Sequence, residues 1–363
     1  MPDVSRAPAV VTALAPDWQV RPYRAGDERA LVELWAEAFG RPMTQEFWRW
    51  KAKGRPSPVE NVGIAVDAGD RPIAQFLGIP CPALIAGRPR SVMIGADVVT
   101  ASAFRRRGVF RATAGALLES WRASGIALVL GLGNSSGASL AHSPDCEQPF
   151  RLDWRIRVLR PERLLARKMR IRPIGRMRRA GDLWNGWWSG RDEGSEISVQ
   201  AVSAVGPELD AFWSEARSRV TNALVHDASW LRWRYEKRPE NRGYTIILAR
   251  RDDRPVGYAV HRVLARPTGT AVQIAELFAP GDRAAYRALI AAVIRDARAG
   301  DAELVSTLAV PGSEPDRELR HAGFVFRRRG WPVEITRLDR AIPKESLRAS
   351  GSWLLSGGDF DVV

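Results

Sequence analysis

The sequence has very little metal-ligating or redox-active chemistry. Of its 363 residues, only Cys81 and Cys146 are cysteines and only four are histidines. Two cysteines cannot build a disulfide framework, and no CxxC pair is present to begin a thiolate metal site. We therefore expect a protein that uses no metal.

Long hydrophobic runs are also missing. No stretch of about eighteen uncharged apolar residues occurs, as a membrane-spanning helix would require. The first twenty residues include Pro2, Pro8 and Pro16 and lack the apolar run of a signal peptide. Since 45% of the residues are hydrophobic, the composition is that of a soluble protein long enough for two domains. We expect it in the cytoplasm.

The positive charge is concentrated rather than general. The net charge is +14, and residues 151–180 contribute +10 of it, with twelve Lys or Arg against Asp153 and Glu162. A nucleic-acid-binding face would spread its charge over a folded surface, so a nucleic-acid partner is disfavoured. Apolar and Trp residues interleave with the charge over 151–188. That pattern predicts either peripheral contact with the inner membrane face or a solvated helix between domains.

An internal repeat organises the chain. TQEFWRWKAKGRPSP (44–58) and DASWLRWRYEKRPEN (227–241) match at a constant offset of 183 residues. The same offset places DRPIA (70–74) on DRPVG (253–257), a strand-turn-strand pattern, and a four-residue slip then puts Asp97 opposite Glu276. An Ala-rich helical run and an apolar strand follow in each copy. The repeat predicts two copies of one α/β domain, each a mixed, mostly antiparallel sheet flanked by helices.

The expected domain map follows from the repeat. It consists of a flexible N-terminus (1–17), a first domain (18–155), a basic, Trp-containing linker or insertion with its own helix (156–200), a second domain (201–338) and a C-terminal tail (339–363).

One loop of the first copy has the features of an anion site. In TASAFRRRGVFRATAGALL, which begins at Thr100, three arginines precede Gly108, and a helical pattern starts near Val109. A glycine lets the backbone approach a ligand closely, and a helix N-terminus presents free N–H groups and a positive dipole. The stretch therefore favours a phosphate site, although this pattern alone is a weak signal.

The same run resembles the acetyl-coenzyme A pyrophosphate loop of the GNAT N-acetyltransferase superfamily, in which Arg or Gln, two residues and Gly are followed by one residue and Gly or Ala. Arg105 and Gly108 match this pattern, whereas Phe110 stands where Gly or Ala is usual. GLGNSSGASL resembles the next family element, with Asn134 at its usual place. ELRHAGFVF in the second copy resembles the run that closes the domain. The resemblance covers about three-quarters of the chain and implies tandem GNAT domains.

The resemblance implies which residues hold acetyl-coenzyme A. Val98, Val99 and Thr100 would contact the pantetheine arm through their main chain, and Asn134 belongs to the same site. The pyrophosphate would bind at the loop, through Arg105, Arg106, Arg107, Gly108, Val109, Phe110 and Arg111. The second copy reads APGDRAAYRAL there, with one arginine and an acidic Asp282. Only the first domain is expected to bind the cofactor, and the second is predicted to be degenerate, stabilising the first or forming part of the substrate cleft.

The implied reaction is direct attack of an amine on the thioester, assisted by a carboxylate base. Asp97, on the strand before the loop, is the first candidate; the alternative is a hydrogen-bonded strand-end polar group. The general-acid tyrosine of many GNAT enzymes is missing from residues 134–155, where His142 is a candidate acid. Cys146 is expected to be a small core residue rather than a nucleophile.

Several alternatives stay open on sequence grounds. The FWRWK and WLRWR motifs predict helix faces packed on the sheet or, less favoured, an aromatic substrate wall. The preferred function is N-acyl transfer to an amine-bearing small molecule such as an amino sugar or other cell-envelope intermediate. The rivals are a non-catalytic tandem GNAT binding protein and a basic module for nucleic acid or a membrane surface. Neither the oligomeric state nor the path of the tail WLLSGGDFDVV toward the cleft follows from the sequence.

Overall fold

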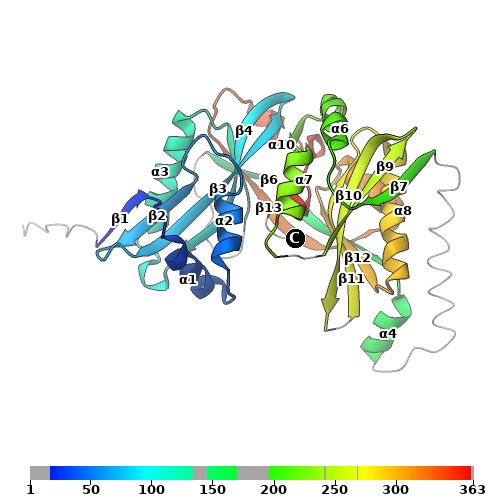
Figure 1. The fold of residues 1–363 in the computed structure, drawn as a ribbon, viewed down its shortest axis with the longest axis horizontal. Coiled ribbons are helices and arrows are strands. Elements are labelled where there is room, and N and C mark those ends of the chain that lie inside the picture. The colour runs from blue at the N-terminus through cyan, green and yellow to red at the C-terminus, as the bar shows by residue number, and fades with distance from the viewer. Residues whose placement is uncertain (1–16, 134–144, 170–195, 241–242, 268, 361–363) are drawn as a thin grey trace, which may run out of the picture.

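The computed structural model describes residues 17–133, 145–169, 196–240, 243–267 and 269–360. It has two lobes, each a twisted sheet covered by helices, and a central region where strands from both repeats cross (Figure 1). The predicted tandem α/β architecture is confirmed.

The first repeat contains the predicted hairpin, strand, helix and following strand, preceded by two helices and by β1, a strand that was not predicted. Its helices are α1 (Glu28–Phe39), α2 (Gln45–Lys53) and α3 (Val109–Ala123). Its strands are β1 (Trp18–Pro22), β2 (Val62–Asp67), β3 (Pro72–Ile85), β4 (Arg88–Thr100), β5 (Leu128–Leu132) and β6 (Cys146–Val158). Local chemistry sets several ends: the Thr44 side chain accepts from the Phe47 N–H to begin α2, and Asp70 (φ 61°) turns β2 into β3.

The second repeat follows the same plan. Its helices are α6 (Glu208–Ala216), α7 (Ala228–Leu231), α8 (Arg283–Ala299) and α9 (Glu314–His321), and a π-helical turn at Arg232–Glu236 extends α7. Its strands are β7 (Ile197–Val202), β8 (Asn222–Leu224), β9 (Tyr244–Arg251), β10 (Arg254–Arg266), β11 (Gly269–Phe278), β12 (Leu304–Ala309) and β13 (Val325–Arg337).

The remaining elements lie between and after the repeats. The helix predicted in RPERLLARKMR is present as α4 (Pro161–Met169). The C-terminal tail contains α10 (Lys344–Arg348) and the short β14 (Trp353–Leu354), which pairs with β8. Among the helices of the described ranges, none has the length and apolar character needed to cross a bilayer. Residues 170–188 of the basic segment lie outside those ranges, so membrane contact there stays a prediction.

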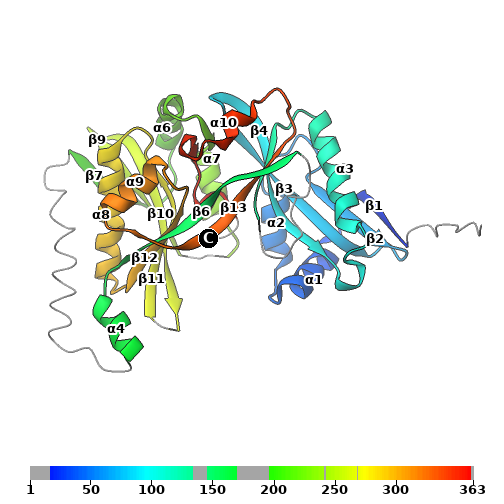
Figure 2. The same cartoon turned by 180° about the vertical axis from the view of Figure 1, so that it is seen from behind.

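The two repeats exchange their last strands. The sheet order is β1-β2-β3-β4-β5-β13-β6-β12-β11-β10-β9-β7. β13 of the second repeat pairs with β5 of the first, whereas β6 of the first repeat pairs with β12 of the second. The two exchanged strands also pair with each other and cross between the lobes (Figure 2). Each half of the sheet is therefore completed by a strand from the other repeat.

The repeated Trp and Arg motifs meet at the contact between the lobes. Arg55 lies over the rings of Trp230 and Trp233, 5.4 and 5.3 Å from their centroids. Its repeat counterpart Arg238 lies over Phe47 and Trp50, at 4.9 and 5.0 Å. As predicted, each motif also turns a Trp to its own sheet: Trp48 donates to Gln75 of β3 and Trp230 to Glu276 of β11. The rest of the two motifs packs on each other across a pseudo-two-fold axis. A helix-spaced aromatic pattern predicts a buried face but does not say which surface covers it.

Candidate functional site: the loop between β4 and α3

The loop before α3 leaves a helix N-terminus open. Gly108 takes the N-cap position with φ 80°, a left-handed conformation that favours glycine, and no side chain of the described residues caps the helix. A Cβ on Gly108 would meet no atom within 4 Å. Val109 is buried and anchors the first turn, and the Phe110 ring packs edge-on against Phe76. Among the described residues, no side chain therefore occupies this helix end.

The predicted arginines surround this turn. Arg105 donates from Nε to the Thr100 carbonyl oxygen at 3.1 Å, which ties the loop to the end of β4. Arg107 pairs with Asp17 and stacks on Phe104, 4.9 Å from its centroid. Arg106 (φ 61°) and Arg111 are exposed and form no ion pair within the described part of the chain. Arg105, Arg106, Arg107 and Arg111 thus lie around one turn. Arg106 and Arg111 are the two that have no ion-pair partner among the described residues.

The corresponding turn of the second domain is filled by carboxylates. Asp282 caps α8 by accepting from the Ala285 N–H, and it pairs with Arg251 at 2.8 Å. Both Glu314 carboxylate oxygens accept from the Gly281 N–H, at 3.1 and 3.0 Å. Because acidic side chains already satisfy this helix end, an added phosphate would meet negative charge. The helix end is therefore open in the first domain, whereas the protein's own carboxylates occupy the corresponding helix end in the second domain.

The end of β4 is kinked next to the loop. Gln75 of β3 pairs with Val99 and Leu77 pairs with Ala96, so Asp97 and Val98 together face one residue in a β-bulge. Asp97 has φ 47°, a left-handed value that is uncommon for a non-glycine residue. β4 pairs with β5 only from Val92 to Ile94. Among the residues described, Val98, Val99 and Thr100 therefore have no strand partner on their β5 side.

The Asp97 carboxylate is anchored through one oxygen. Lys51 Nζ lies 2.8 Å from Oδ1, and Trp35 Nε1 donates to the same atom at 3.3 Å. The side chains of Lys51 and Asp97 are 0% and 7% exposed. Asp97 Oδ2 is buried and accepts no hydrogen bond from any described group. A buried carboxylate oxygen without a donor has free capacity to accept a hydrogen bond.

Lys51 and Trp35 were not predicted as partners of Asp97. The repeat could have indicated Lys51, since it aligns Lys51 with Arg234 and so keeps a cation at this place in both copies. Nothing in the spacing points to Trp35, which reaches Asp97 from α1.

Three further residues were considered from the sequence, and the structure describes only Cys146 among them. Asn134 and His142 lie outside the described residues. Cys146 is half-buried, and burial raises the pKa of its thiol to about 11, with a smaller opposing effect from Thr336. A thiol with that pKa is a poor nucleophile at neutral pH. No cluster of three or more potential metal ligands occurs in the parts of the chain that the structure covers.

Comparison with known proteins gives the family. A GNAT acetyltransferase domain model matches residues 19–140, and a second GNAT domain model matches residues 223–318. Together they cover more than half of the chain, which belongs to the GNAT acetyltransferase family and carries two such domains. Family membership supports acyl transfer as the general reaction class. No protein of curated function matches the chain.

Solved structures share the two-domain fold. A probable N-acyltransferase from Enterococcus faecalis V583 aligns with a TM-score of 0.65 at 13% identity, over 88% of this chain and 72% of that one. A GCN5-related N-acetyltransferase from Anabaena variabilis aligns with a TM-score of 0.66 at 11% identity, over 89% and 73%. Another from Kribbella flavida gives 0.59 at 18% identity, over 88% and 70%. At these identities the likeness concerns the fold alone.

Proposed function

We propose that the protein is an N-acyltransferase whose first domain binds acetyl-coenzyme A and passes the acetyl group to an amine. One observation carries the proposal: the same helix N-terminus is open at Gly108 in the first domain and filled by Asp282 and Glu314 in the second. An open, uncapped helix end among arginines suits a pyrophosphate. Acetyl-coenzyme A would supply the activated thioester.

The chain offers two adjoining surfaces to hold this molecule. N–H groups from Arg106 to Arg111 and the arginine side chains would bind the pyrophosphate. The unpaired edge of β4 at Val98, Val99 and Thr100 would take the amide-containing arm, because an extended main chain can pair with amides as a strand does. Asn134 stays a predicted contact.

Asp97 is the proposed base. An amine must lose a proton to form an amide, and a carboxylate in a water-poor site can accept it directly or through water. Lys51 and Trp35 hold Oδ1 and so leave Oδ2 for this task. His142 stays the proposed acid for the leaving thiolate. We propose an amine-bearing small molecule as the acceptor, with amino sugars and other cell-envelope intermediates as the first compounds to test.

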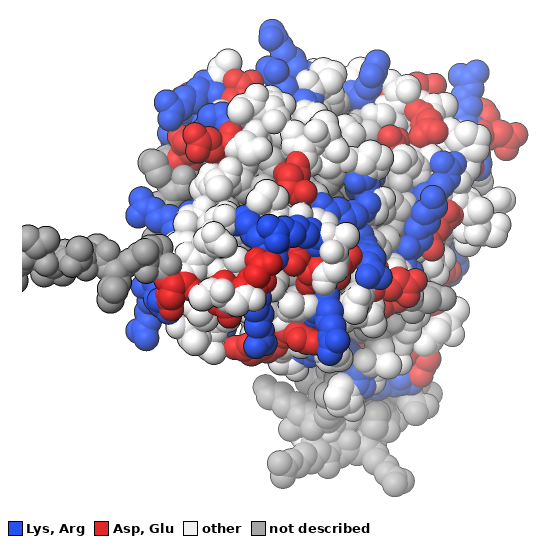
Figure 3. All heavy atoms as spheres, turned by 60° about the vertical axis from the view of Figure 1, so that its left-hand side comes forward, with Lys and Arg blue, Asp and Glu red and all other residues white. Residues whose placement is uncertain are grey.

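The surface around the first domain does not favour the nucleic-acid alternative. On the face seen in Figure 3, Lys and Arg side chains alternate with Asp and Glu and do not form one broad positive field. Sequence-independent binding to nucleic acid depends on such a field. The cytoplasmic location stays part of the proposal. Peripheral membrane contact was predicted through 151–188, but residues 151–158 belong to β6, which is paired on both sides and buries Arg155 and Arg157, so the proposal keeps only the basic segment after β6.

Cofactor binding is tested with two matched glycine substitutions. Gly108→Glu places a carboxylate at the open helix end, and Gly87→Glu places one at the β3–β4 turn. The two glycines have φ 80° and 71°, and a Cβ at either position meets nothing within 4 Å. Acetyl-coenzyme A should raise the melting temperature of the wild type and of Gly87→Glu, and fail to do so for Gly108→Glu. A wild type that acetyl-coenzyme A does not stabilise would refute the proposal.

The role of Asp97 is tested by thiol release with a panel of amino sugars and polyamines. Asp97→Asn should lower kcat by about 10²- to 10⁴-fold while leaving acetyl-coenzyme A affinity unchanged. Asp252→Asn is the control, since Asp252 also has a left-handed backbone (φ 48°) but lies in the β9–β10 turn. Equal rates in both variants would remove Asp97 from the chemistry.

A further inference from the structure

The second domain has a split between β11 and β12. The two strands pair in parallel from Ala271 to Ile274 against Leu304 to Thr307, and then separate. In the first domain β4 and β5 part in the same way after Ile94 and Leu130. The split of the second domain therefore corresponds to the surface of the first domain that is proposed to hold the cofactor arm.

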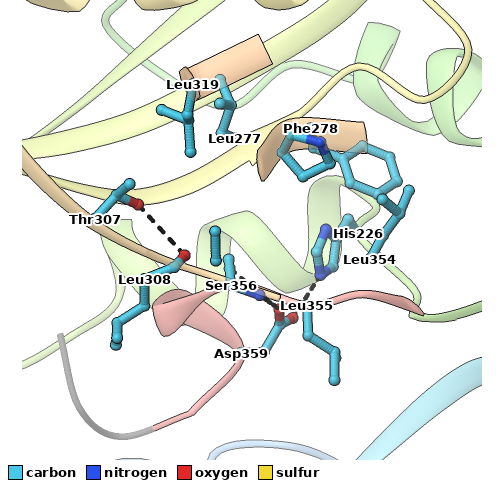
Figure 4. Close-up of a pocket in the computed structure, with 12 residues that line it drawn as sticks. His226, Leu277, Phe278, Thr307, Leu308, Leu319, Leu354, Leu355, Ser356 and Asp359 are labelled. Atoms are coloured by element: carbon cyan, nitrogen blue, oxygen red, sulfur yellow. Dashed lines mark hydrogen bonds and ion pairs between the residues drawn. The ribbon is translucent and has the colours of Figure 1, made fainter. Parts of the chain in front are cut away.

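The C-terminal segment 353–360 lies in this split. Trp353 and Leu354 pair with β8, and Ser356 then forms an antiparallel bridge to Ala309 at the end of β12. Leu354 lies beside Phe278, and together with Leu355 and Leu319 these side chains line a cavity of only about 20 Å³ (Figure 4). This volume is close to that of a single water molecule. The segment thus fills the split almost completely.

Backbone contact in the split is so close that only glycine fits. A Cβ on Gly358 would lie 2.3 Å from the Tyr235 hydroxyl oxygen and 2.4 Å from Glu276 Cγ. Glu276, the repeat counterpart of Asp97, is fully buried beneath it. Its oxygens accept from Trp230 Nε1 at 3.0 Å and from the hydroxyls of Tyr235 and Tyr258, each at 2.6 Å.

Charged side chains fix the end of the segment. His226 Nε2 lies 2.7 Å from Asp359 Oδ1, and both side chains are buried (Figure 4). The other Asp359 oxygen accepts from the Ser356 N–H at 2.6 Å, which closes the turn Gly357–Asp359. Arg234, the counterpart of Lys51, donates to the carbonyl oxygen of Phe360. Two residues of the second domain, His226 and Arg234, therefore hold the Gly-Gly-Asp-Phe end of a short apolar strand.

We infer that the split between β11 and β12 is a peptide-binding groove whose ligand is the chain's own segment 353–360. The segment takes the place that a pantetheine arm would need there, while Asp282 and Glu314 take the place of the phosphates. The second domain is thereby closed to a cofactor from both ends. The inference rests on these contacts alone and holds whether or not the first domain catalyses acyl transfer.

Two matched glycine variants of the full chain test the groove. Gly358→Ala introduces a methyl group where none fits, whereas a Cβ on Gly351 meets its nearest atom at an ordinary 3.7 Å. In hydrogen exchange, Gly358→Ala should lose protection over residues 353–360 by about tenfold or more, with the core strands β2 and β3 unchanged. Gly351→Ala should match the wild type. Equal protection of 353–360 in both variants would overturn the inference.

A peptide provides the second measurement. A fluorescent peptide of residues 351–363 should bind Gly358→Ala, whose own segment is displaced, and not the wild type, whose groove is taken. The same peptide carrying Asp359→Asn should bind at least about tenfold more weakly, because it loses the charge that faces His226. If Gly358→Ala does not fold, full-length Asp359→Asn replaces it as the receptor. No binding to either variant, or equal binding to the wild type, would overturn the inference.

Discussion

Trp50 and Trp233 hydrogen-bond each other's main chain across the two repeats. Trp50 Nε1 donates to the Trp233 carbonyl oxygen at 2.9 Å, and Trp233 Nε1 donates to the Trp50 carbonyl oxygen at 3.2 Å. Their rings stack with centroids 4.9 Å apart and an interplanar angle of 17°. The two residues are 183 positions apart, the offset of the repeat. This symmetric contact explains why the Trp motif occurs in both copies although only one copy has an open helix end before its long helix.

Removing one of these indole groups should destabilise the whole molecule. Trp50→Phe leaves the buried Trp233 carbonyl without its donor, which costs about 1–3 kcal/mol of unfolding free energy. Trp233→Phe should cost a similar amount, and the double variant should depart from additivity because the two side chains touch. Urea unfolding measures all three. Trp18→Phe, at a half-buried indole without a described hydrogen bond, should cost less; a larger loss there would contradict this account.

The exchanged strands predict that neither repeat folds alone. A fragment ending in the 170–195 segment lacks β13, which pairs with β5, and the remainder of the chain lacks β6, which pairs with β12. Each fragment would expose an unpaired, partly apolar sheet edge and aggregate. Co-expressed fragments should form a stable one-to-one complex, detectable by size-exclusion chromatography. A monomeric fragment with a cooperative unfolding transition would show that the exchange is dispensable.

The sequence was sufficient for features that depend on local patterns. The repeat predicted two domains, and Gly108 predicted the start of α3 at Val109, because glycine and helix-start signals are local. Phosphate binding at this loop stays a prediction. The exchange of β6 and β13 could not be predicted, since each strand has the same pattern whichever sheet it joins. The partners of Asp97 and the tight fit of Gly358 depend on residues distant in the chain. The path of the tail did not follow from the sequence, because the partner of Asp359 is His226, which lies 133 residues earlier in the chain.

Stability should fall as the pH rises through the titration of His226. Burial alone would lower its pKa, but the carboxylates of Asp359, Glu276 and Asp227 outweigh burial and raise the pKa to about 9 from 6.5. A His whose pKa is raised in the folded state stabilises the fold fully below pH 6.5. That contribution, about 3 kcal/mol, is lost as the pH rises toward 9.

Unfolding free energies at pH 6 and pH 9.5 test this prediction. The wild type should lose about 3 kcal/mol more than His226→Gln over this range, since the difference between the two proteins cancels other titrating groups. His261 gives the opposite control. Burial lowers the pKa of His261, against a smaller effect of Asp296, so its neutral form favours folding at higher pH. His261→Gln should therefore not reduce the loss at high pH, and an equal effect of both variants would exclude His226 as the cause.

Lys51 should matter far more to stability than Lys53, two residues along the same helix. Lys51 and Asp97 form a buried pair at 2.8 Å, and Lys51→Met would leave the Asp97 carboxylate buried with only the Trp35 indole as a described donor. Removing one member of a buried pair costs about 3–5 kcal/mol. Lys53 pairs with Glu60 at the same 2.8 Å, but their side chains are 34% and 39% exposed, so Lys53→Met should cost about 1 kcal/mol or less.

Urea unfolding of these two variants, and of Lys51→Met with Asp97→Asn, separates charge from packing. If the cost of Lys51→Met comes from the unpaired carboxylate, neutralising Asp97 in the double variant should recover part of the lost free energy. If instead the cost reflects lost contacts of the lysine stem, the double variant should be no more stable than Lys51→Met. A recovery would also establish that Asp97 needs its cation to stay buried at the bulge of β4, beside the open loop.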